Sequence, residues 1–316
     1  NAMLPEVKTL LEQMTASGMP DIMAMPVEEM RAAFAGQSGL TDLPGRDIAS
    51  VSDQTISGPG GDIPIRIYDP NPGHTDPSRA LVFYHGGGYV IGDLESHDSV
   101  ARRLIDGLGI PGIAVDYRLA PEFPFPAPLD DCLAATQWAA SGLAEVLGRP
   151  ITGLIVSGDS AGGNLAAVVA QSLRSDEDAT IDLQVLLYPV IDFAGDYASR
   201  AAHSEGKLLD KSAMDMFSAS YCADETMYTD PKISPLYEDD LAGLAPAVVV
   251  VAEYDPLHDE GVAYADKLKA AGISVWLRDE AGLIHGFYSF RQALPTAEAR
   301  TEELIETLKE ALVTLS

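Results

Sequence analysis

The spacing of apolar residues changes along the chain, and each change predicts a different kind of element. Up to about residue 50, apolar residues recur every three or four positions, which predicts two short helices over residues 5–18 and 26–36. Residues 51–57 and 62–70 alternate between apolar and polar side chains instead, as half-buried antiparallel strands do. The chain is therefore expected to open with helices and to continue with a strand pair.

Six further strands are predicted from continuous apolar runs rather than from alternation. Strands that are buried on both faces have this pattern, because neither face meets water. The six runs are residues 80–84, 112–117, 151–158, 182–189, 246–253 and 273–280. Helical patterns separate them, over residues 97–108, 129–147, 161–174, 260–271 and 295–314. This alternation predicts an α/β fold with a mostly parallel central sheet and helices on both faces.

Residues 191–240 interrupt the alternation, because two predicted sheet strands flank a long segment with no strand pattern of its own. Insertions of this length in α/β enzymes usually serve a function. The predicted architecture is therefore one large α/β unit that carries a long insertion before its last two strands.

Composition and charge narrow the function classes. The chain has 316 residues, of which 47% are hydrophobic, enough to fill the core of a large domain. Its 48 acidic and 20 basic residues give a net charge of −28, which disfavours nucleic acid and anionic membranes as partners. The same charge motivates the hypothesis of a salt-rich habitat, which a collapse of activity in molar salt would contradict.

Hydropathy and cysteine spacing indicate where the protein works. The longest apolar run, residues 245–252, is too short to span a bilayer, and no basic-then-apolar leader opens the sequence. Cys132 and Cys222 have neither the spacing of a disulfide framework nor that of a zinc site. We therefore expect a cytoplasmic protein with reduced thiols.

A G-x-S-x-G motif occupies residues 158–162, between a predicted strand and a predicted helix. In that context the turn presents the serine hydroxyl at the carboxyl end of the sheet, and the glycines remove side chains that would collide there. The following helix directs its positive end toward the hydroxyl. Ser160 is therefore the predicted nucleophile, against the alternative of a Gly-Ser helix entry without chemistry.

Three glycines follow a predicted strand in VFYHGGGYVIGD, where they cost stability unless the bare backbone has a use. Attack by serine on an ester creates an oxyanion, which backbone N–H groups stabilise where no side chain intervenes. We expect these donors from Gly86, Gly87 and Ala161. A phosphate-binding loop is the alternative, but its lysine is absent. His85 is expected to shape the loop through hydrogen bonds, and His97 to cap or open the next helix.

A base and an orienting acid must complete a serine site, and two of the six histidines are candidates for the base. In α/β-hydrolases the acid and the histidine follow successive late strands. Asp255 follows one predicted strand and His285 the next, whereas His258 lies three residues after the acid, on a helix. Asp255 and His285 are therefore predicted to complete the site. Asp259 and Glu260 are rival acids that we expect to cap and charge that helix.

Six motifs in this order make the chain resemble the bacterial hormone-sensitive-lipase-like (family IV) esterases, which have the α/β-hydrolase fold, over essentially its whole length. The motifs are HGGGYVIGD (85–93), DYRLAPEFPFPAP (116–128), GDSAGGN (158–164), YP (188–189), DPLHDEG (255–261) and HGF (285–287). The resemblance implies the nucleophile, acid, base and oxyanion donors named above. It also implies a helical cap, made by residues 1–50 and part of 191–240, over a catalytic domain of residues 51–316.

The function implied by the resemblance is that of a serine carboxylesterase, which hydrolyses short- to medium-chain acyl esters through an acyl-enzyme without a cofactor or metal. An amide or other acyl hydrolase would share every motif and stays open, as does a silent ligand-binding protein. Plant gibberellin receptors are similar in fold but lack the histidine, so His285 favours an enzyme. The expected partner is a small-molecule ester, and the last sheet strand is an edge suited to a homodimer.

Two further expectations concern the cap and the proline-rich motif. Methionines gather in the predicted cap segments, at Met14, Met19, Met23, Met25, Met30, Met214 and Met216. Thioether side chains adapt to varied apolar shapes, so a promiscuous pocket is one hypothesis, while packing onto the body is the alternative that we favour for most of them. In the proline-rich motif we expect a structural loop in which Arg118 pairs with Glu122.

Overall fold

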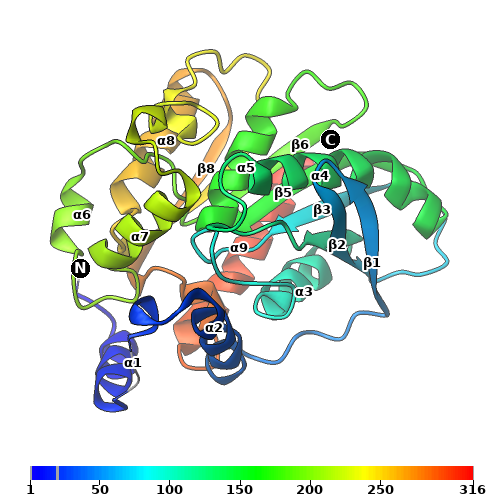
Figure 1. The fold of residues 1–316 in the computed structure, drawn as a ribbon. Coiled ribbons are helices and arrows are strands. Elements are labelled where there is room, and N and C mark those ends of the chain that lie inside the picture. The colour runs from blue at the N-terminus through cyan, green and yellow to red at the C-terminus, as the bar shows by residue number, and fades with distance from the viewer. Residues whose placement is uncertain (1, 19–20, 316) are drawn as a thin grey trace.

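An eight-stranded, mostly parallel sheet forms the centre of the computed structural model, which describes residues 2–18 and 21–315 (Figure 1). The strands are β1 (Ser50–Gly58), β2 (Gly61–Asp69), β3 (Ser78–Tyr84), β4 (Gly112–Val115), β5 (Ile151–Asp159), β6 (Ile181–Leu187), β7 (Ala247–Tyr254) and β8 (Val275–Ile284). Each predicted strand is found within a few residues of its predicted bounds. The predicted ranges 1–50 and 51–316 also include residues 1, 19, 20 and 316, which lie outside the described residues.

The strands follow the order β1-β2-β4-β3-β5-β6-β7-β8 across the sheet. β1 and β2 form an antiparallel hairpin, and β2 is antiparallel to β4, whereas all pairs from β4 to β8 are parallel. The alternating pattern thus marks the hairpin and the continuous apolar runs mark the parallel strands, as predicted. The carboxyl ends of the parallel strands share one edge of the sheet, so the loops that follow them come together there.

The last strand is longer than the predicted range 273–280, because its pairing with β7 continues past an irregularity. The register shifts near the end of β7 so that Tyr254 pairs with Ile284. Asp255 and His285 are the next residues of the two strands. The shift in register therefore places the acid and the histidine side by side at the edge of the sheet.

Helices cover both faces of the sheet. One face carries α4 (Ala127–Leu147), α5 (Ala161–Ser172) and α8 (His258–Ala270), and the other carries α3 (Asp98–Leu108) and α9 (Pro295–Thr314). Successive strand residues contribute to opposite sides, so Val82 packs in the first apolar core and Leu81 in the second. The four helices predicted between strands and the one predicted after the last strand are all present.

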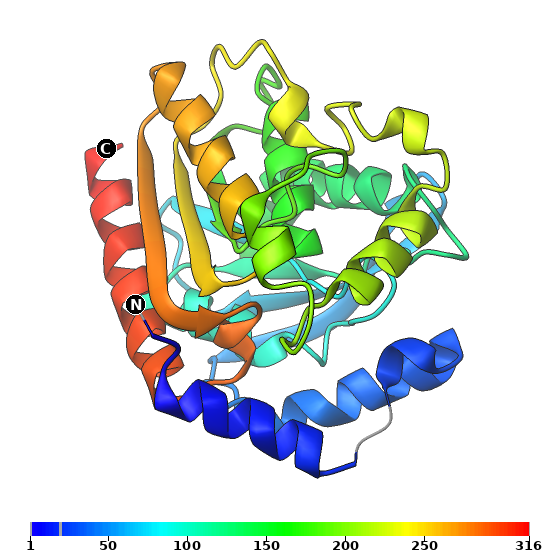
Figure 2. The same cartoon turned by 90° about the vertical axis from the view of Figure 1, so that its left-hand side faces the viewer.

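The N-terminal segment and the insertion supply the remaining elements, most of which lie on one side of the molecule (Figure 2). They are α1 (Pro5–Ala16), η1 (Ile22–Ala24), α2 (Val27–Thr41), α6 (Ala198–Ala202), α7 (Lys211–Tyr221), η2 (Glu225–Met227) and η3 (Pro235–Tyr237), and a short η4 (Phe287–Ser289) follows β8. Val7 and Leu10 of α1 are buried in the same apolar core as α3 and α9. The first helix therefore packs on the α/β body.

The second N-terminal helix continues past its predicted end at Gly36. It runs through Gly36 and Gly39 to Thr41, because glycine weakens a helix by about 1 kcal/mol relative to alanine but does not remove its hydrogen bonds. The Thr41 carbonyl oxygen accepts N–H groups of Gln292 and Ala293 at 3.1 and 3.3 Å. These contacts fix the end of α2 to the chain that follows the histidine loop.

A third, smaller apolar cluster joins α2 to the glycine-rich loop. Met30 of α2 is buried against Val90, Ile91 and Ala120, and Phe217 of α7 packs on the same cluster.

In the part of the chain that the structure describes, no helix has both the length and the apolar character needed to cross a membrane.

Candidate active site

The predicted nucleophile lies at a sharp turn between β5 and α5. Ser160 has a φ angle of 57° and a ψ angle of −115°, a conformation that residues other than glycine rarely adopt. A hydrogen bond from the Ser160 N–H to the Leu187 carbonyl oxygen, 2.9 Å long, holds the turn. A Cβ at Gly162 would overlap the Tyr84 carbonyl oxygen, and one at Gly158 would overlap the Gly162 backbone. The motif glycines therefore allow close packing of β3, β5 and α5 around the serine.

Three side chains from separate loops meet at the carboxyl ends of β5, β7 and β8. Ser160 Oγ lies 2.8 Å from His285 Nε2, and His285 Nδ1 lies 2.6 Å from Asp255 Oδ2. The Asp255 side chain is buried, and its Oδ1 accepts the Leu257 N–H at 2.8 Å. A nucleophile, a base and an orienting acid need these atoms in this order. The structure therefore brings the three predicted residues together.

The rival histidine is directed away from the serine. His258 Nδ1 lies 2.8 Å from Asp259 Oδ1, and its Nε2 lies 3.2 Å from both carboxylate oxygens of Asp279. Burial lowers the pKa of His258, but the two carboxylates outweigh burial and raise it above its ordinary value. His258 is thus an ion-pairing residue at the start of α8 and not the base, which is what chain order predicted.

The rival acids lie in the first turn of α8, as predicted, but neither caps the helix through its side chain, and both reach the insertion instead. Asp259 Oδ2 accepts the Ser199 N–H at 2.9 Å. Glu260 is buried, and its carboxylate accepts the Ile191 N–H at 2.8 Å and an Arg200 N–H at 2.7 Å. Burial raises the pKa of Glu260 to about 7, although Arg200 and the backbone donors act in the opposite direction. The two acids therefore hold the start of the insertion against the body.

The glycine loop differs from the prediction at its first glycine. The Gly86 N–H donates to Asp159 Oδ1 at 2.8 Å, so this amide is directed to a buried carboxylate and not into the site. Gly87 and Gly88 have φ angles of 119° and 60°, which favour glycine, and both line the cavity beside Ser160. The expectation of an oxyanion donor at Gly86 therefore conflicts with its observed partner, and the next two glycines are better placed.

The two histidines next to this loop have different roles. His85 Nδ1 lies 2.6 Å from the Gly86 carbonyl oxygen, and the Tyr117 hydroxyl donates to the His85 carbonyl at 2.6 Å, so His85 does shape the loop. Burial lowers the pKa of His85 to about 4, which keeps the ring neutral. His97 stands at the N-cap position and so opens α3, one of the two predicted roles, but its side chain contacts Asp159 Oδ2 at 3.2 Å and does not cap the helix.

Ser160 and His285 line a cavity of about 790 Å³. The N-terminal segment contributes Met14, Met23 and Phe34 to its wall, and the insertion contributes Leu208, Met214 and Phe217. Other methionines pack away from the cavity: Met30, Met25 and Met216 belong to the third apolar cluster. Met19 lies outside the described residues. The methionines therefore divide between the two hypotheses, with some lining the cavity and others packing helices.

The proline-rich motif is held by pairs that differ from the prediction. Arg118 pairs with Asp131 at 2.9 Å and not with Glu122, so that expectation is wrong. Glu122 instead receives both terminal nitrogens of Arg31, at 2.7 and 3.0 Å. Arg31 Nε also donates to the Val90 carbonyl oxygen at 2.8 Å. One arginine of α2 thus binds both the proline-rich motif and the end of the glycine loop.

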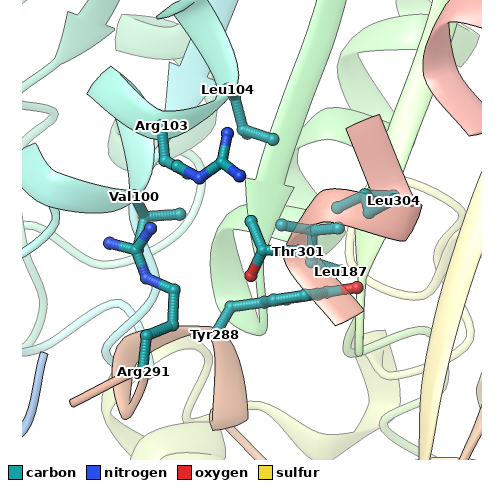
Figure 3. A pocket seen from close by; sticks show the side chains of 8 residues that line it. All are labelled: Val100, Arg103, Leu104, Leu187, Tyr288, Arg291, Thr301 and Leu304. Atoms are coloured by element: carbon teal, nitrogen blue, oxygen red, sulfur yellow. The ribbon is translucent and has the colours of Figure 1, made fainter. Parts of the chain in front are cut away.

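A buried arginine supports the chain behind His285. Arg291 Nε and Nη2 bind the two carboxylate oxygens of Asp42 at 2.8 and 3.0 Å, which ties the end of α2 to the chain after η4. Arg291 and Arg103 border a small cavity beside Tyr288 and Thr301 (Figure 3). Its volume is about 10 Å³, so it has no room for a substrate. This region therefore has a structural role behind the site.

Two residues near the site were not singled out from the sequence. Asp159 stands inside the G-x-S-x-G motif, at the end of an apolar strand. An acidic residue at such a position indicates a buried carboxylate, which needs a partner. Arg31 gave no sequence signal, because its partners Val90 and Glu122 are 59 and 91 residues away.

The match to a known family covers the site. Residues 81–289 match the family described as the alpha/beta hydrolase fold. LipN of Mycobacterium tuberculosis, named a carboxylic ester hydrolase, is 43% identical over 84% of this chain and 72% of its own length. The ethyl acetate hydrolase of Pseudomonas putida is 36% identical over 92% of both chains. The chain therefore belongs to the α/β-hydrolase fold family.

Solved structures narrow the class further. A hyperthermophilic esterase from the archaeon Pyrobaculum calidifontis superposes with a TM-score of 0.91 at 35% identity, covering 100% of both chains. The ester hydrolase EH1AB1 from the metagenome of Lake Arreo, solved with a bipyridine phosphonate derivative, has a TM-score of 0.91 at 40% identity, covering 96% of this chain and 98% of its own. Within the α/β hydrolases, the chain is a hormone-sensitive-lipase-like (family IV) esterase, as its motifs predicted.

Proposed function

We propose that the protein is a serine carboxylesterase in which Ser160, His285 and Asp255 act as nucleophile, base and acid. His285 Nε2 takes the proton of Ser160 Oγ as that oxygen attacks the carbonyl carbon of the ester. The proton then passes to the leaving alcohol, and an acyl-enzyme remains on the serine. Water then attacks the acyl carbon while His285 takes a proton from it. The carboxylic acid product leaves as that proton returns to Ser160. Asp255 holds the imidazole in the required tautomer.

The observation that carries this proposal is the unbroken chain of contacts from Ser160 Oγ to His285 at 2.8 Å and from His285 to the buried Asp255 at 2.6 Å. A serine hydroxyl without an adjacent base is a poor nucleophile at neutral pH. The names of two relatives, a carboxylic ester hydrolase and an ethyl acetate hydrolase, support the same reaction class.

The oxyanion donors we assign are the N–H groups of Gly87, Gly88 and Ala161. Gly86 is left out, because its N–H is directed to Asp159. Ala161 is the first residue of α5, where N–H groups have no acceptor within the helix. Loss of one such donor costs roughly a hundredfold to a thousandfold in turnover in serine hydrolases.

The substrates we propose are esters with short to medium acyl chains. The cavity of about 790 Å³ has apolar walls beside Ser160, which suit an acyl chain or an alkyl alcohol. An amide or other acyl hydrolase would use the same side chains and is the second candidate. The name of the P. putida relative, an ethyl acetate hydrolase, favours the ester.

Three further proposals concern the whole chain: its cap, its oligomeric state and its location. Residues 1–50 and part of 191–240 act as a cap over the catalytic domain 51–316, since both segments line the cavity. A homodimer forms through β8, which pairs with β7 alone among the described strands. Light scattering at increasing protein concentration tests the dimer, and a constant monomer mass would reject it.

A cytoplasmic location agrees with the free, buried Cys132 and Cys222.

The test of the proposed function is the hydrolysis of p-nitrophenyl esters from acetate to laurate, with p-nitroacetanilide as the amide probe. We expect rapid turnover of the shorter esters, slow turnover of the amide, and loss of both in Ser160→Ala. Faster turnover of the amide would favour the second candidate. No turnover of any ester by the folded wild type, or full activity in Ser160→Ala, would reject the proposal.

A further inference from the structure

A buried carboxylate contacts the glycine loop that carries the proposed oxyanion donors (the oxyanion loop, residues 86–88), and the reaction described above does not use it. Asp159 is 5% exposed and is the residue before the nucleophile. Its Oδ1 accepts the Gly86 N–H at 2.8 Å, and its Oδ2 lies 3.2 Å from His97 Nε2. The side chain thus links the nucleophile turn to the loop that follows β3. A Cβ at Gly86 would lie 2.6 Å from Asp159 Oδ2, so the loop and the carboxylate are in close contact.

The contacts around His97 accommodate a proton on both ring nitrogens. The Ser96 oxygen accepts the Asp93 N–H at 2.9 Å, and its hydroxyl lies 3.1 Å from the Asp93 carbonyl oxygen, to which it can donate. With the hydroxyl proton on that carbonyl, His97 Nδ1 is free to donate to Ser96 Oγ at 2.9 Å, while Nε2 donates to the Asp159 carboxylate at 3.2 Å. In this arrangement the ring is an imidazolium, and His97 and Asp159 form a charged pair.

The surroundings of His97 favour this charged form. Burial lowers the pKa of His97, but the carboxylates of Asp159, Asp93 and Asp42 together outweigh burial, so the pKa is raised above its ordinary value. His97 in turn lowers the pKa of Asp159, although burial acts to raise it. The titratable and aromatic groups that face His97 from the neighbouring elements are Asp42, Asp93, Asp159, His85, Phe34 and Phe83. All the carboxylates among them act in the same direction.

We propose that the buried Asp159–His97 pair is a positioning device for the oxyanion hole: His97 fixes the Asp159 carboxylate, and Asp159 fixes the Gly86 amide, which sets the direction of the next two N–H groups. This inference rests on the proposed function. Gly86 precedes the two glycines assigned as donors, so a shift of its peptide plane rotates theirs. A misplacement of about 1 Å can cost roughly a hundredfold in rate. Asp159 and His97 act through the loop and do not touch the reacting atoms.

The test compares kcat and KM for p-nitrophenyl butyrate in matched variants. Asp159→Ala removes both contacts, whereas Asp159→Asn keeps an acceptor for the Gly86 N–H and loses the charge. We expect kcat to fall about a hundredfold in the first variant and about tenfold in the second, with KM changed by less than about threefold. His97→Leu should match Asp159→Asn, and His97→Gln, which keeps a donor, should recover most of the activity.

Asp131 provides a matched control for loss of a buried aspartate. It is 2% exposed and, like Asp159, accepts a backbone N–H, from Arg118 at 2.9 Å, together with a cationic side chain. Asp131→Ala should lower the melting temperature as much as Asp159→Ala does but leave kcat within about twofold of the wild type. An equal fall in kcat in both variants would mean that general destabilisation is responsible and would overturn the proposal.

Binding of phenylboronic acid reports on the oxyanion hole directly, because its adduct with a serine is tetrahedral. We expect its inhibition constant to rise in Asp159→Ala by about the factor by which kcat/KM falls. Unchanged boronate binding would overturn the proposal. An inactive wild type would reject the proposed function and this inference with it, whereas an active wild type with an equally active Asp159→Ala would reject the inference alone.

The pH dependence supplies a readout that a purely structural role would not change. A raised histidine pKa means that the charged pair is complete at lower pH and is lost as the pH rises through the pKa of folded His97. The ratio of kcat in the wild type to kcat in His97→Leu should therefore fall toward alkaline pH, since both proteins share the same catalytic residues and the rest of the pH dependence cancels. A ratio that stays constant with pH would contradict the charged pair.

Discussion

Gly87 and Gly88, with φ angles of 119° and 60°, have a backbone that only glycine adopts without strain. Gly88 also meets a second constraint, because a Cβ there would overlap the ring of Phe217 on α7. Gly88 therefore serves two purposes in this account: it carries a proposed oxyanion donor, and it lets a helix of the insertion approach the loop closely. The glycine triplet predicted donors in this loop, but the second purpose depends on a contact that no local pattern contains.

Gly88→Ala should lower kcat/KM, because the added methyl group must displace either Phe217 or the loop. We expect a fall of roughly tenfold or more, as misplaced oxyanion donors would cause. Activity with p-nitrophenyl butyrate and the melting temperature are the measurements.

Gly109→Ala is the matched control for Gly88→Ala. Gly109 has a similar φ angle, 65°, but an added Cβ there meets nothing within 4 Å. Both variants place a side chain at a positive φ, which costs about 1 kcal/mol. If Gly109→Ala lost as much activity as Gly88→Ala, strain alone would explain the loss and the contact with Phe217 would be irrelevant.

At the scale of elements, α2 couples the N-terminal segment to the oxyanion loop. Its Arg31 binds Glu122 with two nitrogens and also donates to the carbonyl oxygens of Val90 and Ala120, at 2.8 and 3.1 Å. Its Met30 is 2% exposed among the apolar residues of the same loop. The helix therefore lines the cavity and also holds the loop that carries the proposed oxyanion donors.

Arg31→Ala should loosen α2. We expect a clear rise in KM and only a small fall in the melting temperature. Hydrogen bonds to charged groups contribute about 1.5–3 kcal/mol each, and this side chain makes four contacts, of which those to exposed Glu122 count least. Limited proteolysis should cut the connection between α1 and α2 faster in the variant, and kinetics should show the rise in KM.

The control for Arg31→Ala is Arg46→Ala, which removes another N-terminal arginine from a half-exposed pair with Glu298 at 3.5 Å. Exposed pairs of this kind contribute about 0–1 kcal/mol. Arg46→Ala should leave both KM and the rate of proteolysis unchanged. Equal proteolysis of the two variants would show that Arg31 does not anchor the helix.

At the scale of the whole molecule, charge is the most unusual property. A net charge of −28 over 316 residues opposes compaction through self-repulsion. The Debye length falls from about 10 Å in about 0.1 M salt to about 3 Å in about 1 M salt, so salt screens the distant repulsions while buried pairs such as Asp159–His97 persist.

The melting temperature should therefore rise from low salt to molar sodium chloride, with esterase activity retained. Differential scanning calorimetry measures the first quantity and ester hydrolysis the second. A sucrose series that raises the melting temperature equally would assign the effect to solute exclusion instead of charge screening. A protein that loses stability and activity in molar salt would contradict both this prediction and the hypothesis of a salt-rich habitat.

Sequence predicts best where one local pattern determines the outcome. Alternation locates the two hairpin strands and the apolar runs locate the other six, and the motif around Ser160 together with chain order selects Asp255 and His285. Errors occur where a distant partner decides. The Gly86 N–H turns to Asp159, 73 residues away, and Arg118 prefers Asp131 to the nearer Glu122, which Arg31 binds. The continuation of α2 to Thr41 likewise depends on contacts with the chain after the histidine loop.

The most direct test of the central claim is covalent labelling by diethyl p-nitrophenyl phosphate, followed by mass spectrometry of the intact protein and of its peptides. The account predicts one diethylphosphoryl group per chain, on the peptide that contains Ser160, with labelling greatly slowed in His285→Ala and absent in Ser160→Ala. A label on any other residue, or no label on a folded wild type that hydrolyses esters, would show that the nucleophile lies elsewhere and would contradict the account.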